Sequence, residues 1–229
     1  MTASLPLMGP AIDPTDAQRS EQYRFVATLL AAPPGAEALR LVAGLQGDAT
    51  PLGQAHSALA RAAAATDATA VEREYFALFV GVGRGELLPY ASFYLTGFLN
   101  ERPLSDLRDD LARLGVARAE GRHEPEDHIA LLFEVMADMA AGHIPASLDA
   151  QAAFFHRHIA PWAAQFFDDL AMAPSAAFYR PLAEVGRLIV DIEARAFALS
   201  GHAPAPQTAG HQGKGPRGGR REGGEHGKG

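Results

Sequence analysis

Hydrophobic residues recur every three or four positions through most of the first 200 residues, which is the spacing of one face of an α-helix. The pattern is clear in residues 23–30, 104–114 and 129–136. Ala and Leu dominate, Val and Ile are sparse, and no stretch alternates strictly between polar and apolar residues as a half-buried strand does. The pattern therefore predicts an all-α protein.

Residues that favour helix ends separate these periodic segments. Thr15 with Gln18 and Thr69 with Glu72 have the spacing of capping boxes, in which two side chains satisfy backbone N–H groups at a helix start. Further helix starts are predicted at Thr50–Pro51, Pro103, Pro125 and Ser147. Helix ends are predicted at Gly81, Gly115 and Gly142.

Together these signals predict one helical bundle-like domain of about nine or ten helices over residues 16–200. Residues 1–15 are expected to form a flexible N-terminus. Residues 201–229 are rich in glycine and contain no large apolar side chain, so they cannot bury enough surface to offset the entropy of ordering. We expect this C-terminal segment to be disordered.

Composition and charge exclude some classes of function. The chain has no cysteine, which excludes disulfides and cysteine-ligated metal sites. Residues 1–200 carry a net charge of −10 and residues 201–229 one of +3. An acidic body argues against a nucleic-acid partner and leaves room for a basic peptide. No signal peptide and no apolar run long enough to insert in a membrane are evident, so a cytoplasmic location is expected.

A glycine-rich stretch, GVGRGE at residues 81–86, follows an aromatic helix and precedes a second aromatic run. Glycines let backbone N–H groups approach a phosphate, but no strand precedes this stretch and the spacing of the known phosphate-binding loops is missing. A helix end with a flexible turn is the plainer interpretation. Aromatic segments on both sides could alternatively form the walls of an apolar groove, and core packing accounts for at least half of these rings.

The stretch EPEDH at residues 124–128 places Glu124, Asp127 and His128 around a predicted helix start. Carboxylates there can cap backbone N–H groups, and they can also meet a cationic partner. A metal site needs three or more converging ligands, and this stretch lacks the HExxH spacing, so no metal is predicted. His156 and His158 do not share a helix face and are expected at the surface or its boundary.

Three blocks in this order, YFALFVG at 75–81, LPYASFYL at 88–95 and EPEDHI at 124–129, resemble the TorD/DmsD/NarJ family of redox-enzyme maturation chaperones. The resemblance covers about residues 20–200 and implies an all-helical fold, in some members domain-swapped into a homodimer. It also implies a protein that binds the precursor of a molybdopterin oxidoreductase and is not an enzyme. The client-binding residues implied by these blocks are Tyr75, Leu78, Phe79, Pro89, Tyr90, Ser92, Glu124, Pro125, Asp127 and His128.

The resemblance therefore implies a cytoplasmic assembly chaperone that needs no cofactor of its own. It would recognise a twin-arginine leader, the body of the apoenzyme, or both, and hold the precursor for cofactor insertion. Acids at 124–128 would meet the leader's two cations, and the aromatics of 75–98 would meet its apolar segment. Two alternatives stay open at this point: a metal- or nucleotide-dependent hydrolase that uses Glu124, Asp127 and His128, and an unrelated helical interaction module.

Overall fold

The computed structural model describes residues 12–117 and 124–202. Within these ranges the chain forms α-helices and one π-helix, η1, and the only β-type pairing is an isolated bridge between Tyr90 and His128. The elements are α1 (Pro14–Ala31), α2 (Ala36–Ala43), α3 (Pro51–Ala64), α4 (Ala68–Tyr75), η1 (Phe76–Val80), α5 (Ala91–Thr96), α6 (Arg102–Arg113), α7 (Ile129–Ala140), α8 (Leu148–His158), α9 (Ala163–Met172) and α10 (Tyr179–Leu199). The all-α prediction is confirmed.

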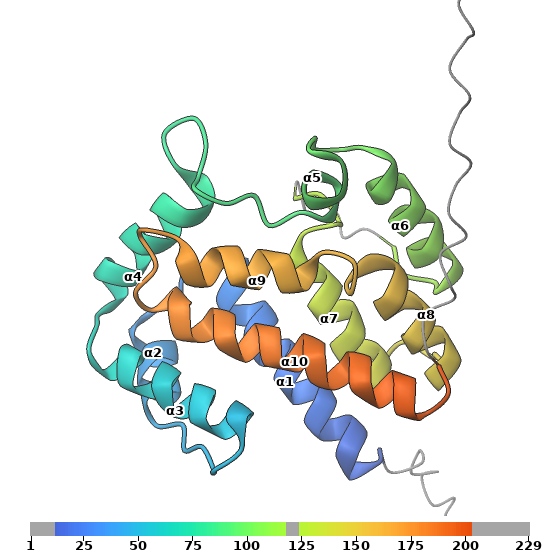
Figure 1. Ribbon diagram of the computed structural model, residues 1–229, viewed down its shortest axis with the longest axis horizontal. Coiled ribbons are helices and arrows are strands. Elements are labelled where there is room, and N and C mark those ends of the chain that lie inside the picture. Colours follow the sequence, from blue (N-terminus) through green and yellow to red (C-terminus); the bar gives the residue numbers. More distant parts are fainter. Residues whose placement is uncertain (1–11, 118–123, 203–229) are drawn as a thin grey trace, which may run out of the picture.

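Four helices form the centre of the bundle. Helix α1 packs along α7, and α10 packs along α9 (Figure 1). Helices α2, α3 and α4 lie at one end, while α5, α6 and α8 lie at the other (Figure 1). The loop that follows η1 projects from the upper edge in this view.

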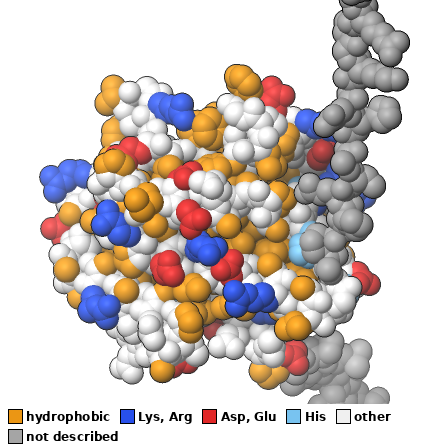
Figure 2. All heavy atoms as spheres, in the orientation of Figure 1, with side chains coloured by type: hydrophobic (Ala, Val, Ile, Leu, Met, Phe, Trp, Pro, Cys, Tyr) orange, Lys and Arg blue, Asp and Glu red, His pale blue; other side chains and the backbone are white. Residues whose placement is uncertain are grey.

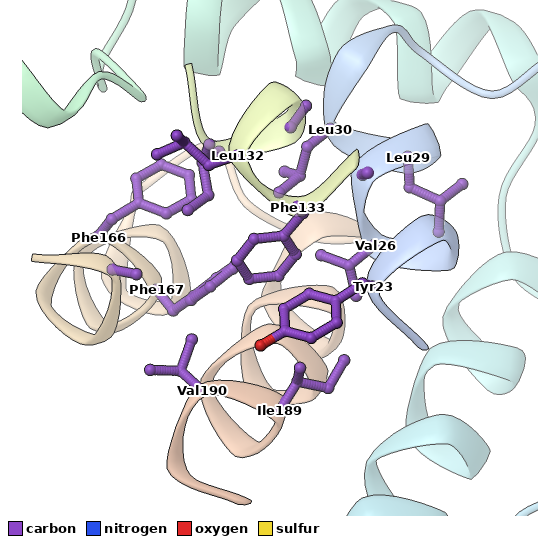
Figure 3. Packing of buried hydrophobic residues seen from close by; sticks show 14 of the residues in the cluster. Tyr23, Val26, Leu29, Leu30, Leu132, Phe133, Phe166, Phe167, Ile189 and Val190 are labelled. Carbon is purple, nitrogen blue, oxygen red and sulfur yellow. The ribbon is translucent and has the colours of Figure 1, made fainter. Parts of the chain in front are cut away.

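Aromatic rings fill the space between the four central helices (Figure 3). Tyr23 of α1 meets Phe133 of α7 edge to face with ring centroids 5.0 Å apart, and Phe133 in turn lies 5.8 Å from Phe167 of α9. Helix α10 approaches this stack at Gly186, where an added Cβ atom would lie 2.2 Å from the Phe167 ring. Glycine at this position therefore sets how closely α9 and α10 pack.

The outer face of α9 and α10 is built differently. Charged side chains of both signs lie among hydrophobic ones there (Figure 2). Arg187 contacts both Asp168, at 3.1 Å, and Asp191, at 3.0 Å. Exposed ion pairs of this kind contribute little to stability.

Several predicted helix ends are confirmed. Thr50 accepts a hydrogen bond from the Gly53 N–H at 3.0 Å, and Ser147 accepts one from the Ala150 N–H at 3.2 Å. The three glycines predicted to end helices have φ values of +62°, +74° and +73° at Gly81, Gly115 and Gly142. Positive φ is favourable for glycine and costly for other residues, which explains why helices end at these positions.

Other predicted helix starts were wrong by a few residues. Asp13 caps α1 in place of Thr15, and Asp67 caps α4 in place of Thr69, because the short aspartate side chain reaches the first free N–H groups. Helix α7 begins at Ile129 and not at Pro125. Residues 1–11 of the predicted flexible N-terminus, and all of the predicted disordered C-terminal segment except residues 201 and 202, lie outside the described residues.

Candidate functional site

A pocket of about 250 Å³ lies where the aromatic segment, the Pro89–Tyr90 segment and the start of α7 meet the end of α1. Its lining residues are Ala31, Tyr75, Phe79, Val80, Pro89, Tyr90, Glu124, Pro125, His128, Ala130, Leu131 and Glu134. Polar and apolar atoms contribute about equally to the walls: aromatic and aliphatic side chains supply the apolar part, and two glutamates add negative charge. This combination suits a ligand that has both an apolar part and a cation.

The π-helix η1 shapes the first wall. It ends where the Gly81 N–H donates to the Phe76 carbonyl, five residues back, at 2.6 Å. Such an extra residue per turn shifts the following side chains around the helix, and π-helical turns are frequent at functional sites. Here the Tyr75 and Phe79 rings lie 5.0 Å apart, and Phe79 also lies 5.4 Å from Tyr179 of α10.

Two tyrosine hydroxyls fix this wall to α1. The Tyr75 hydroxyl donates to the Ala31 carbonyl at 3.2 Å, and the Tyr179 hydroxyl donates to the Leu29 carbonyl at 3.1 Å. These are carbonyls of the last turn of α1, which have no partner within the helix. Burial raises the pKa of both hydroxyls, so they stay protonated and remain hydrogen-bond donors.

The glycine loop, residues 81–86 after η1, is closed by backbone hydrogen bonds at its base. The N–H groups of Glu86 and Leu87 donate to the carbonyls of Ala77 and Leu78 at 3.1 and 2.8 Å. A Cβ atom on Gly85 would lie 2.6 Å from the Leu78 carbonyl oxygen, so the loop needs glycine there for close approach. The turn expected from the sequence is therefore a loop closed by backbone hydrogen bonds, and its tip, at Val82, is 98% exposed.

The other two walls of the pocket, the Pro89–Tyr90 segment and the start of α7, are joined to each other by hydrogen bonds. The Ile129 N–H donates to the Pro89 carbonyl at 2.9 Å, and the Ala91 N–H donates to the Asp127 carbonyl at 3.0 Å. The Asp127 side chain accepts a further hydrogen bond from the Ser92 N–H at 2.8 Å. Asp127 and Ser92 are completely buried, so their role is to hold the two walls together.

Tyr90 and His128 face each other across this junction with ring centroids 5.2 Å apart. His128 Nδ1 accepts a hydrogen bond from the Ala130 N–H at 3.1 Å and so caps α7. The Tyr90 hydroxyl donates to Glu124, and burial together with this carboxylate raises the pKa of Tyr90. Glu124, a residue of the predicted acidic stretch, is therefore held over the aromatic wall.

The structure brings seven of the ten sequence-predicted site residues together in this pocket. They are Tyr75, Phe79, Pro89, Tyr90, Glu124, Pro125 and His128. Leu78, Ser92 and Asp127 do not line it and are fully buried. Among the described residues no group of three or more His, Asp or Glu side chains is arranged to hold a metal ion.

Sequence reasoning missed part of the lining. Leu131 and Glu134 follow His128 at intervals of three on α7, so helical spacing could have found them. Ala31 comes from the end of α1 and has no signal in the sequence. The second aromatic run extends past its helix, because α5 ends at Thr96 and leaves Phe98 70% exposed beyond it.

The fold is a helical domain with a pocket that is lined by residues of the three blocks noted in the sequence. The model of the nitrate reductase delta subunit family matches residues 45–168, which is more than half of the chain. The chain therefore belongs to this family, and the resemblance to the TorD/DmsD/NarJ group is confirmed. No helix in the described part of the chain is long and apolar enough to cross a membrane.

Individual relatives agree with this assignment. The chaperone protein TorD of Vibrio cholerae is 31% identical over 115 residues, which cover 44% of this chain and 52% of the relative. TorD of Aliivibrio fischeri is 28% identical over 111 residues, with the same coverage of both chains. The chain thus spans about half the length of these curated relatives.

One solved structure is also similar. It belongs to a proposed redox enzyme maturation protein from Archaeoglobus fulgidus. The match covers 83% of this chain and 99% of that chain, with a TM-score of 0.49 and 16% sequence identity.

Proposed function

We propose that this protein is an assembly chaperone for a molybdopterin oxidoreductase. It binds the precursor of the catalytic subunit at a twin-arginine leader and holds it in the cytoplasm until the cofactor has been inserted. The observation that carries this proposal is the convergence of the three sequence blocks on one pocket. The relatives named chaperone protein TorD support the same class of function.

The chemistry of the pocket supports a leader as ligand. A twin-arginine leader presents two cations beside an apolar, helix-prone segment. Glu124 and Glu134 supply negative charge, while Phe79, Val80 and Leu131 supply apolar surface. Charge pairing then steers and orients the leader, and burial of its apolar segment provides most of the affinity.

The size of the pocket limits what it encloses. Pockets that enclose a drug-sized molecule measure roughly 300–1,000 Å³, and this one measures about 250 Å³. It therefore receives one or two side chains of a leader, and the remainder lies on the adjoining surface. Binding and release, with no bond chemistry, is the function that this geometry favours.

A designed peptide tests leader binding without knowledge of the client. The probe is a fluorescent peptide with an Arg-Arg pair followed by about 11 Leu and Ala residues, which form three helical turns. We expect the full chain to bind it, and to bind a Gln-Gln version roughly tenfold less tightly because charge-assisted contacts are lost. Equal binding of the two peptides would argue against recognition of the arginine pair.

Three variants of the full chain locate the contact. Glu124→Gln should weaken probe binding about threefold, and Leu131→Ser should weaken it about tenfold because apolar contact is lost. Glu72→Gln makes the same charge change at an exposed position of α4 outside the pocket and is the control. An effect of Glu72→Gln as large as that of Glu124→Gln would mean that only overall charge matters.

The client itself is identified by capture. The full chain is used to recover partners from its native cells, and we expect an unprocessed molybdopterin oxidoreductase catalytic subunit among them. Leu131→Ser should recover less of it. Recovery of no such subunit, under conditions in which another chaperone recovers its client, would contradict the proposal.

A further inference from the structure

The C-terminal sequence contains its own pair of adjacent arginines. Arg220 and Arg221 stand in the sequence GGRREGG, with two glycines before them, Glu222 and two glycines after them, and no apolar segment. Residues 201–229 carry a net charge of +3, opposite in sign to the −10 of residues 1–200. The pair therefore has the cationic half of a twin-arginine leader and lacks the apolar half.

The structure fixes the point at which this segment leaves the bundle. The His202 N–H donates to the Phe197 carbonyl at 2.8 Å, and the His202 carbonyl accepts a hydrogen bond from His156 Nε2 at 2.9 Å. His202 Nε2 also contacts Asp149 Oδ1 at 2.5 Å. The segment thus starts from a set position between the end of α10 and helix α8.

The chain beyond that point is long enough to reach the pocket. Arg220 lies 18 residues after His202, a stretch that spans up to about 60 Å when extended. A globular domain of this size is roughly 40 Å across. Glycine-rich sequence of this length has a root-mean-square span of about 23 Å, so a pocket on the far side of the domain is reached by the more extended conformations of the segment.

The pocket also has the complementary charge. Its described lining includes the carboxylates of Glu124 and Glu134 and no Lys or Arg. The tyrosine and phenylalanine rings beside them offer flat faces, on which guanidinium groups stack favourably. Two adjacent arginines are therefore a suitable occupant of the pocket in the absence of a client.

We propose that Arg220 and Arg221 occupy the pocket of their own chain and are displaced by the arginine pair of a client leader. This inference rests on the proposed function, since it assumes that the pocket receives arginines. Without an apolar segment we expect the internal pair to bind weakly, and we take a dissociation constant of about 1 mM for the separate peptide, at the weak end of the affinity scale. Tethering supplies an effective concentration in the millimolar range, which is enough to fill the pocket for much of the time.

Competition measured on the full chain tests the proposal. The variant Arg220→Gln/Arg221→Gln should bind the Arg-Arg probe roughly 2- to 10-fold more tightly than the unchanged chain, because the competing ligand has been removed. The control Lys214→Gln/Arg217→Gln removes the same two charges from the same segment. It should change the affinity by less than about twofold. Equal effects of the two double variants, or no effect of either, would overturn the proposal.

A second experiment needs no leader peptide. The chain has no cysteine, so Gly223→Cys provides a single site for a nitroxide spin label two residues after Arg221. We expect the label to broaden the methyl NMR signals of Leu131 and Val80 in the pocket. The broadening should disappear when Arg220→Gln/Arg221→Gln is added and should persist with Lys214→Gln/Arg217→Gln.

The two experiments separate this proposal from the proposed function. If the probe binds but the label broadens neither methyl signal, the internal pair does not occupy the pocket, while leader recognition stands. If broadening depends on Arg220 and Arg221 but no variant binds the probe, the pocket binds the internal pair and the proposed function fails.

Discussion

The side chain of Glu74, on helix α4, caps the start of helix α10, which lies about 100 residues later in the sequence. Its carboxylate accepts the Tyr179 N–H at 2.8 Å, and it also accepts the N–H groups of Ala177 at 2.8 Å and Phe178 at 3.1 Å. No side chain at the start of α10 performs this role. Because Tyr75, the next residue, forms a pocket wall, this contact ties the wall to the longest helix of the bundle.

Replacing Glu74 should therefore destabilise the whole domain. Glu74→Ala removes a charged acceptor from three backbone N–H groups, and we expect it to lower the free energy of unfolding by about 2 kcal/mol. Glu72→Ala, at an exposed position of the same helix, should change it by less than about 0.5 kcal/mol. Urea unfolding measures both, and similar losses in the two variants would show that the α10 contact contributes nothing specific.

Asp127 should act through stability more than through direct contact with a client. Asp127→Ala leaves the buried Ser92 N–H without its acceptor, which we expect to cost about 1–3 kcal/mol. Asp127→Asn keeps an acceptor oxygen and should recover part of that loss. Asp109→Ala, on the exposed side of α6, is the control. Unfolding monitored by circular dichroism measures the stability of each variant. If Asp127→Ala and Asp109→Ala were equally stable, this role of Asp127 would be contradicted.

His158 makes stability depend on pH. It was expected at the surface or its boundary, but it is only 6% exposed, and Nε2 lies 2.6 Å from Asp110 Oδ2. Burial, assisted by the charge of Arg157, lowers the pKa of His158 from 6.5 to about 4. The unfolded chain therefore binds more protons than the folded chain between these values, and acidification favours unfolding.

We expect the contribution of His158 to be complete above pH 6.5 and to be lost as the pH falls towards 4. The slope approaches about 1.4 kcal/mol per pH unit at most. Urea unfolding between pH 7 and pH 5 measures it, and His158→Gln should reduce the slope. His56, whose pKa burial also lowers, contributes in the same direction, so the comparison with His158→Gln isolates one residue. A slope that His158→Gln leaves unchanged would contradict the prediction.

The glycine loop should tolerate change at its tip and not at its base. Gly85→Ala places a Cβ atom 2.6 Å from the backbone of Leu78 and Phe79. We expect it to cost about 1–3 kcal/mol and to weaken probe binding, because Phe79 lines the pocket. Val82→Ser changes a fully exposed side chain and should cost less than about 0.5 kcal/mol. Thermal unfolding and probe titration of both variants test this, and a Gly85→Ala protein as stable as Val82→Ser would show that the loop can open.

Local signals predicted helix ends well where local chemistry decides them. Gly81 ends η1 because only glycine readily takes its positive φ, and Thr50 starts α3 because its hydroxyl meets a free N–H group. The start of α7 is decided by contacts that are distant in the sequence. Pro125 is suited to a first helical position, but the hydrogen bonds that join Asp127 to Ala91 and Ser92 hold that stretch outside the helix. Those partners lie 36 and 35 residues away and cannot be found from local spacing.

The candidate site likewise contains residues that local sequence predicts and residues that it does not. The three blocks predicted most of the pocket because each contributes a short run of neighbouring residues to it. Leu78 shares its block with Tyr75 and Phe79, but it is fully buried and does not line the pocket. The π-helix at residues 76–80 has no signal in the sequence. Which side chains of this aromatic helix face the pocket was therefore not predictable from residue spacing alone.

The walls of the pocket come from segments that are separate in the sequence, so no short piece of this chain contains the site. A bound leader is then a ligand of the folded protein alone. At a leader concentration 100 times the dissociation constant, such a ligand adds about 2.7 kcal/mol to the free energy of unfolding. Under the proposed function, protection therefore runs in both directions: the client lengthens the lifetime of its chaperone, and chaperone without a client is the form most exposed to proteases.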